Sequence, residues 1–273
     1  MPDRPPAAFR RVDLDVLAAI VRGDVDAVLR SSADGAFDAD RFVAFAAAHQ
    51  LAGFVHARIE GTPARTAFSP GAAARLAGAY VRQWTTNERL AREVRDLAGT
   101  FERAGCPFVL LKGLHTALAY HGGIDRRGMA DLDVLVRRSD LDRAMRLLAA
   151  RGFARRSHAL FGRHVAAAFT HAFEFVREGV PIDLHWALAT HPSYRIDYDA
   201  LWARRRRFDA AGTAVDVLDD ADALAFQVLG IAKDLELGTL TLKCFVDLHA
   251  MVRALDARSA WEAFLATRAL ERT

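Results

Sequence analysis

The sequence predicts an α+β protein in which a mixed β-sheet core lies between two helical regions. Apolar residues recur at helical spacing through most of the first 104 residues and again after residue 219. Between these regions, residues 108–186 carry short apolar runs and alternating patterns that are typical of strands. We therefore expect three parts: an N-terminal helical region over 1–104, a core over 105–190 and a C-terminal helical region over 191–273.

The composition is that of an ordinary globular protein of 273 residues, with 52% apolar and 26% charged residues. A net charge of +3 is too small to indicate nucleic-acid binding by itself. No window reaches the roughly 18 apolar residues of a membrane span, and the opening residues MPDRPPAAFRR lack the apolar segment of a signal peptide. Cys106 and Cys244 are far apart, which is typical of reduced thiols, so we expect a cytoplasmic protein without membrane contact.

The N-terminal region is predicted to contain short helices followed by one long helix. The short helices are expected over 14–21, 25–29, 42–49 and 51–59. An unbroken apolar pattern over 72–103 predicts the long helix, which leads into the first strand. His49 and His56 have no nearby cysteine or carboxylate to complete a metal set, so we interpret them as packing residues.

The core opens with a strand, a glycine turn and a short helix. The apolar run 108–111 follows a glycine and a proline and is too short for a helix, which predicts a buried strand. Lys112 and Gly113 break the run, and helical spacing then continues until Gly122.

The next strand carries two carboxylates on one face. The segment DLDVLV at 131–136 alternates with a period of two, so Asp131 and Asp133 point one way while Leu132 and Val134 point the other. Two adjacent buried carboxylates repel each other and resist desolvation. A divalent cation removes that conflict, and oxygen ligands of this kind suit Mg²⁺ or Mn²⁺.

A helix and a hairpin are expected to complete the core. Ser139 and Asp140 are typical helix N-cap residues ahead of a helix over 141–152. The segments 166–176 and 180–186 then predict a hairpin with a glycine turn between them. Strand, helix and strand together predict a mixed sheet with helices on one face.

The second strand of that hairpin places Asp183 and His185 on one face. An aspartate among apolar neighbours needs a reason, and supplying a third carboxylate to the Asp131 and Asp133 pair is such a reason. His185 could orient Asp183 or contact a substrate, but a structural histidine is an equal alternative.

The C-terminal region begins with four consecutive arginines at 204–207, which either bind phosphate or nucleic acid or form a solvated helix end. Helices are then expected from Asp219, over 240–255 and over 261–270. Lys243 and Asp247 lie four residues apart on one of these helices, where an intrahelical ion pair would explain them.

Several motifs resemble a known family. A strand, a glycine turn, a short helix and Asp-X-Asp on the next strand resemble the signature of the DNA polymerase beta-like nucleotidyltransferase superfamily. More narrowly, LLKG at 110–113, RGMADLDVLV at 127–136 and VPIDLHW at 180–186 are similar to the uncharacterised nucleotidyltransferase family of bacteria, with a weaker likeness at 242–248. The wider superfamily usually has Gly-Ser where this chain has Lys112 and Gly113.

The resemblance implies an enzyme that transfers a nucleoside monophosphate from an NTP, with ATP as the first candidate, to a hydroxyl-type acceptor on a small molecule or protein, releasing pyrophosphate. It implies that Asp131 and Asp133 hold Mg²⁺ or Mn²⁺ and that Asp183 completes the metal site and helps to deprotonate the acceptor. The implied phosphate-binding residues are Lys112, Gly113 and Arg127. Substrate-contacting or supporting roles are implied for His185, Lys243 and Asp247.

Two other functions remain open at this stage. One is a non-catalytic nucleotide-binding or interaction protein on the same fold, although three retained carboxylates disfavour it. The other is an RNA-directed nucleotidyltransferase of the toxin type that modifies tRNA, for which the arginine run at 204–207 is the supporting feature.

Overall fold

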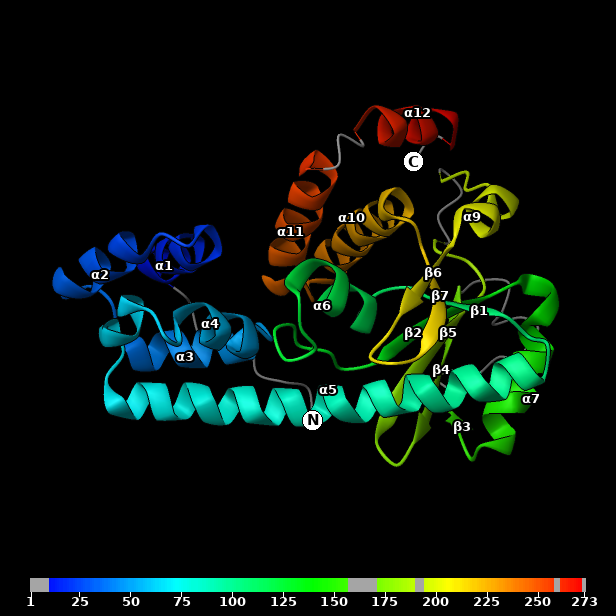
Figure 1. Ribbon diagram of the computed structural model, residues 1–273, viewed down its shortest axis with the longest axis horizontal. Helices are drawn as coiled ribbons and strands as arrows, with labels where there is room; N and C mark the ends of the chain where they lie inside the picture. Colours follow the sequence, from blue (N-terminus) through cyan, green and yellow to red (C-terminus); the bar gives the residue numbers. More distant parts are fainter. Residues whose placement is uncertain (1–9, 157–170, 190–193, 258–260, 272–273) are drawn as a thin grey trace.

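The computed structural model describes residues 10–156, 171–189, 194–257 and 261–271. In this part of the chain, a mixed β-sheet packs beside one long helix, with a helical region at one end and further helices on the other side of the sheet (Figure 1). The α+β fold class predicted from the sequence is confirmed.

The regular elements in the described part of the N-terminal region are all helices. It contains α1 (Arg11–Arg22), α2 (Val25–Ala33), α3 (Ala39–Ala48), α4 (Ala52–Ile59), the 3₁₀ helix η1 (Pro63–Ala67) and the long α5 (Pro70–Arg103). Helix α5 begins where the Ser69 hydroxyl accepts a hydrogen bond from the Ala72 amide at 3.1 Å, with Pro70 in the first turn, where a proline is tolerated. The predicted long helix over 72–103 is thus confirmed, two residues longer at its start.

Helix α5 belongs to two hydrophobic clusters. Its first half contributes Leu76 and Ala79 to the cluster formed with α1–α4. Its second half contributes Val94 and Phe101 to the cluster beneath the sheet. The same 34-residue helix therefore carries the N-terminal region and supports the core.

The sheet has seven strands within the described residues, in the order β3-β4-β5-β2-β1-β7-β6. These are β1 (Phe108–Leu110), β2 (Leu132–Val136), β3 (Ala154–Arg155), β4 (Ala172–Arg177), β5 (Val180–His185), β6 (Arg206–Asp209) and β7 (Ala214–Val217). The pairs β2·β5 and β1·β7 are parallel, and the other four pairs are antiparallel. The predicted hairpin is β4 and β5, while residues 166–170 of its expected first strand lie outside the described residues.

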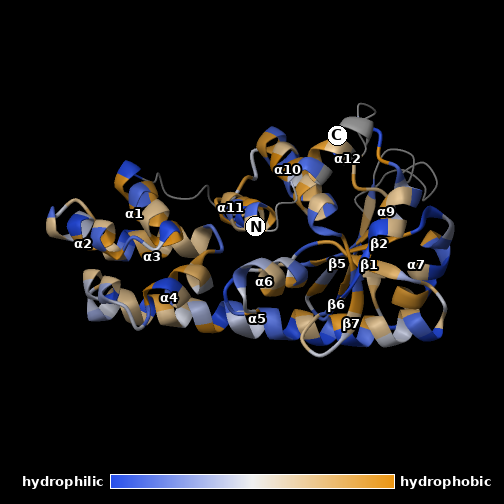
Figure 2. Cartoon of the chain, turned by 45° about the horizontal axis from the view of Figure 1, so that its top comes forward, coloured by the Kyte–Doolittle hydropathy of each residue, from blue (hydrophilic) through white to orange (hydrophobic). Residues whose placement is uncertain are grey.

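Helices cover both faces of the sheet, which corrects the expectation of helices on one face. The remaining helices are α6 (Leu114–His121), η2 (Arg138–Asp140), α7 (Leu141–Ala150), α9 (Tyr198–Arg204), α10 (Asp220–Leu237), α11 (Lys243–Ala257) and α12 (Trp261–Glu271). Val134 lies in the cluster with α5 and α7, whereas Leu135 lies in the cluster with α9, α10 and α11. Hydrophobic residues accordingly dominate the central strands (Figure 2), because β2 is buried on both faces.

One local expectation was wrong. Strands β6 and β7 lie in the segment expected to be helical, because strands of four residues give little periodic signal. The predicted N-cap is confirmed, since Asp140 is the N-cap of α7, although its side chain makes no capping hydrogen bond. Both cysteines are free thiols. Within the described ranges, no helix is long and apolar enough to cross a membrane.

Candidate functional site

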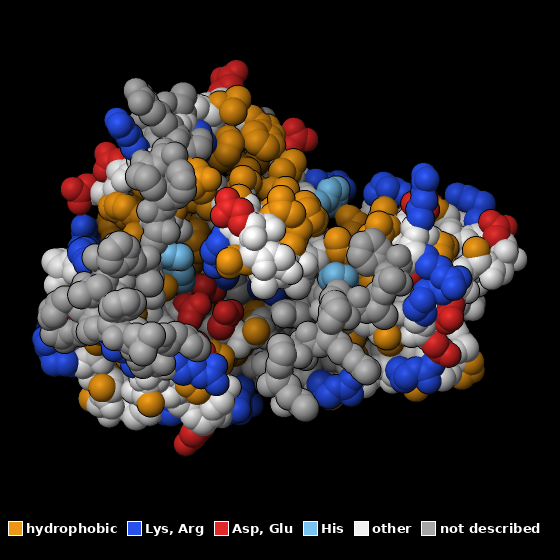
Figure 3. All heavy atoms as spheres, turned by 180° about the vertical axis from the view of Figure 1, so that it is seen from behind, with side chains coloured by type: hydrophobic (Ala, Val, Ile, Leu, Met, Phe, Trp, Pro, Cys, Tyr) orange, Lys and Arg blue, Asp and Glu red, His pale blue; other side chains and the backbone are white. Residues whose placement is uncertain are grey.

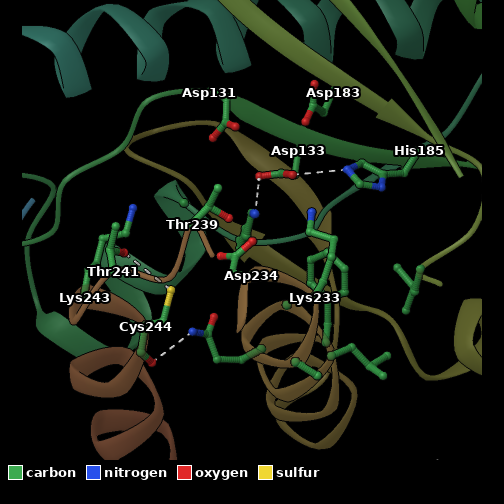
Figure 4. A pocket seen from close by; sticks show the side chains of 18 of the residues that line it. Asp131, Asp133, Asp183, His185, Lys233, Asp234, Thr239, Thr241, Lys243 and Cys244 are labelled. Carbon is green, nitrogen blue, oxygen red and sulfur yellow. Dashed lines mark hydrogen bonds and ion pairs between the residues drawn. The ribbon is translucent and has the colours of Figure 1, made fainter. Parts of the chain in front are cut away.

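Two neighbouring parallel strands bring the predicted carboxylates together. Asp133 of β2 pairs in register with Asp183 of β5, and Leu135 pairs with His185. Matched residues of paired strands face the same side of the sheet, so Asp133, Asp183 and His185 share one face. Asp131 lies just before β2 and points into the same space (Figure 4).

Asp133 is the most enclosed of the carboxylates, at 3% exposure. Its Oδ1 lies 3.1 Å from Nε2 of His185, and its Oδ2 lies 3.4 Å from the Lys112 ammonium. Burial alone raises the pKa of Asp133, but the Lys112 charge and the His185 hydrogen bond outweigh it and hold the pKa well below its usual range. The negative charge of Asp133 in turn raises the pKa of Lys112, so the two groups form a stable ion pair.

The pKa values of Asp131 and Asp183 shift upward, in the opposite direction to that of Asp133. Among the described residues neither carboxylate has a hydrogen bond or an ion pair. Burial, together with the charges of Asp133 and Asp131, raises the pKa of Asp183 to about 6. Burial and the Asp133 charge also raise the pKa of Asp131. The site therefore holds more negative charge than its own cations balance.

The donor set fits a divalent metal ion. Ligand atoms of Asp133, Asp183 and His185 all lie within 4.8 Å of one another, and a cation there would relieve the repulsion that raises the pKa of Asp183. Asp131 is outside this group of three. The space-filling view shows acidic side chains in a hollow beside a histidine (Figure 3). The metal-binding roles of Asp131, Asp133 and Asp183 stay predictions.

The glycine turn has the geometry expected of it. Gly113 is the N-cap of α6 with φ +68° and ψ −104°, a conformation that a residue with a Cβ adopts only under strain. A Cβ here would lie 3.4 Å from the sulfur of Met129. Gly113 and Lys112 both line the cavity described below, so the turn brings the start of α6 to the carboxylates.

Arg127 and Asp247 form a buried ion pair, and Arg127 also lines the cavity described below, so its predicted phosphate-binding role stays a prediction. The Arg127 Nη2 lies 2.8 Å from Asp247 Oδ2, and His121 Nε2 lies 2.8 Å from Asp247 Oδ1. Burial alone raises the pKa of Asp247, but the Arg127 charge and the His121 hydrogen bond lower it to about 2. The expected intrahelical pair of Lys243 and Asp247 is thus wrong, because Asp247 pairs with a residue 120 positions away.

Lys243 instead ties three segments together at the edge of the cavity. Its ammonium donates to the side-chain oxygen of Gln50 at 2.7 Å and to the carbonyl of Gly128 at 3.2 Å. Burial and the nearby Arg127 charge lower the pKa of Lys243 to about 8. Asn87 of α5 supports the same loop, since its amide donates to the carbonyl of Arg127 at 2.7 Å.

These residues surround a cavity of about 630 Å³. The carboxylates and His185 form one wall, and residues of α10, α11 and the segment between them form the other (Figure 4). The sequence reasoning missed several lining residues, which are Gln50, His171, Tyr194, Phe226, Lys233, Asp234, Thr239 and Thr241. No motif marked them. For the α10 residues, the available signal was the presence of polar side chains on a helix that also had to cover the sheet.

Each arginine of the run at 204–207 forms an ion pair with an aspartate. Arg204 makes a paired contact with Asp222 at 2.9 and 3.0 Å. Arg205 and Arg207 both contact Asp216, at 2.9 and 3.4 Å, while Arg206 contacts Asp220 at 2.8 Å. These pairings account for the run as part of the fold, while the side chains of Arg206 and Arg207 remain 43% and 58% exposed. The RNA-directed function that the run suggested stays a prediction.

The mixed sheet, the paired carboxylates and the cavity beside them are the features that we expected of a nucleotidyltransferase. The chain belongs to the family described as uncharacterised nucleotidyltransferase, whose model matches residues 35–271. The family expected from the sequence motifs is confirmed, and the match extends well beyond them at both ends.

Solved structures with similar folds are more distant. The antibiotic-resistance factor ANT(2'')-Ia in solution shares 13% identity and a TM-score of 0.48, covering 67% of this chain and 93% of that chain. The crystal structure of ANT(2'')-Ia with adenylyl-2''-tobramycin has 12% sequence identity and a TM-score of 0.47, and the match covers 66% of this chain and 98% of that chain. An antigenic nucleotidyltransferase-like protein from Paracoccidioides brasiliensis has 17% sequence identity and a TM-score of 0.41, and the match covers 68% of this chain and 89% of that chain. The search of curated proteins found no match.

Proposed function

We propose that this protein transfers a nucleoside monophosphate from an NTP to a hydroxyl group of an acceptor, with release of pyrophosphate. One observation carries the proposal. Asp133 and Asp183 lie in register on adjacent strands, with Asp131 beside them, and all three line a cavity of about 630 Å³. Such a cavity lies within the range of small-molecule sites, so we propose a small-molecule acceptor before a protein.

In this reaction the acceptor oxygen forms a bond to the α-phosphorus, and the bond from that phosphorus to the pyrophosphate breaks. The proton of the hydroxyl needs a base within the cavity. Asp183 suits this role by its position, because its carboxylate lies in register with Asp133 and lines the cavity in which the acceptor would bind.

Asp131, Asp133 and Asp183 would hold the divalent ion, Mg²⁺ or Mn²⁺, that the sequence motifs imply. A bound ion supplies neutralisation of the phosphate charge and lowers the pKa of the attacking hydroxyl. The chain contributes positioning: backbone N–H groups at the start of α6 can face a phosphate across Gly113, and Lys112 lies beside Asp133.

The test is transfer of ³²P from α-labelled ATP, GTP, CTP and UTP with Mg²⁺ or Mn²⁺, with a cell extract of small molecules as acceptor. We expect a labelled product with the wild type and none with the Asp131→Asn/Asp133→Asn variant. Asp216→Asn is the matched control, because it removes a carboxylate that lies on the far strand β7. Equal labelling by the wild type and the double variant would refute the proposal.

A further inference from the structure

His185 is not fully explained by its contact with Asp133. The side chain is 4% exposed, and Nε2 lies 3.1 Å from Asp133 Oδ1. Its other nitrogen, Nδ1, is buried and has no hydrogen-bond partner among the described residues. The partner of one ring nitrogen normally fixes which nitrogen carries the proton. In the metal-free protein Nε2–H donates to the Asp133 carboxylate. Because no described residue donates a hydrogen bond to Nδ1, a cation that replaces the contact with Asp133 can shift the ring proton to Nδ1 and bind the Nε2 lone pair.

The distance between Nε2 and Asp133 Oδ1 also suits two ligands of one ion. Two donors about 2.1 Å from a metal and at right angles to each other lie about 3.0 Å apart. The observed separation is 3.1 Å, and a carboxylate oxygen of Asp183 lies within 4.8 Å of both. Lys112 contacts the other oxygen of Asp133, Oδ2. An ion between His185 and Asp133 Oδ1 therefore does not need to displace the lysine.

The chemistry of these donors narrows the choice of metal. Mg²⁺ prefers oxygen ligands and keeps its water molecules, whereas imidazole nitrogen suits first-row transition metals. We propose that His185 is a metal ligand and that Asp133, Asp183 and His185 form a site that prefers a first-row transition-metal dication to Mg²⁺. The inference rests on the proposed function for the role of the ion, but binding can be measured without any transfer.

The test uses the full-length protein with MnCl₂ and no nucleotide. Pulsed EPR of the Mn²⁺ form is expected to show the coupling of a directly bound ¹⁴N nucleus. In His185→Gln, whose amide can still donate to Asp133, we expect that coupling to disappear. The Kd for Mn²⁺ should then rise about tenfold or more, while the Kd for Mg²⁺ changes by less than about threefold.

His171→Gln is the matched control, because His171 also lines the cavity and its ring centroid lies 5.4 Å from that of His185. This variant should keep both the coupling and the Kd. Wild-type protein that binds no Mn²⁺, or binds it without ¹⁴N coupling, overturns the inference even if the His185 variant does not fold. Loss of the coupling in the His171 variant instead of the His185 variant also overturns it.

The two proposals fail in different ways. Label transfer without a ¹⁴N coupling would leave the proposed function standing and remove His185 from the metal site. A ¹⁴N coupling without transfer of label would support the metal site and count against the transferase.

Discussion

Replacing Asp247 with Asn should strongly destabilise the protein. The carboxylate is 1% exposed and Arg127 is 6% exposed, and three contacts of 2.8 to 3.0 Å join them. Asn keeps the shape but leaves the guanidinium charge buried without a counter-charge. Removing one partner of a buried pair costs about 3–5 kcal/mol, which is a large share of the roughly 5–15 kcal/mol that stabilises a typical protein.

Urea unfolding of the wild type and Asp247→Asn gives this difference in the free energy of unfolding. Its pH dependence provides a second check. Because the folded-state pKa of Asp247 is lowered to about 2, its stabilising effect is complete above the ordinary carboxyl pKa of about 4 and disappears as the pH falls toward 2. The gap between the two proteins should therefore be full at pH 6 and should narrow below pH 4.

The matched control is Asp216→Asn, which also removes a carboxylate with two arginine partners. Those arginine side chains are 36% and 58% exposed, so the expected loss is below about 1 kcal/mol. An Asp247→Asn loss below about 1 kcal/mol, or a loss that is the same at pH 3 and pH 6, would contradict the reasoning.

Three further predictions use the same measurements or simple chemistry. Gly113→Ala should lower the free energy of unfolding by about 1–3 kcal/mol, because the φ of +68° at this position strains any residue with a Cβ. Gly230→Ala, within α10, should not destabilise the protein, because the new Cβ meets no atom within 4 Å. Equal losses for the two variants would contradict this reasoning. Cys106 should resist alkylation by iodoacetamide at pH 8, because burial raises its pKa to about 11; fast labelling of folded protein would contradict this. The double variant Arg205→Ala/Arg207→Ala should leave label transfer unchanged. Its free energy of unfolding should fall by less than about 2 kcal/mol, because both side chains form exposed ion pairs. Loss of label transfer would show that the arginine run takes part in the reaction.

Local rules were enough for the central strand and the long helix. The alternation over 131–136 predicted that Asp133 and Val134 point to opposite faces of the sheet. The structure agrees, because Val134 packs in one hydrophobic cluster while Leu135, which shares the face of Asp133, packs in another. The family motifs also linked Asp183 to Asp133 before their register was known, and the two lie directly paired. These features depend on neighbours in sequence or on a motif, so they could be predicted.

Tertiary packing decided what the sequence did not reveal. Lys243 and Asp247 satisfy the spacing of an ion pair within a helix, yet Asp247 pairs with Arg127 because three elements meet around it. The wall formed by α10 follows from how that helix covers the sheet. The polar side chain of Lys233 was a local signal, whereas Phe226 gave none. Strand β7 likewise depends on pairing with β1, about a hundred residues earlier.

Helix α5 has a consequence for how the protein comes apart. One continuous helix buries Leu76 in one cluster and Val94 in the other. Unfolding of either cluster therefore exposes part of α5 and destabilises the other cluster. We expect a calorimetric scan to contain a single endotherm. A protease that cuts near the middle of α5 should release no stable fragment from either end.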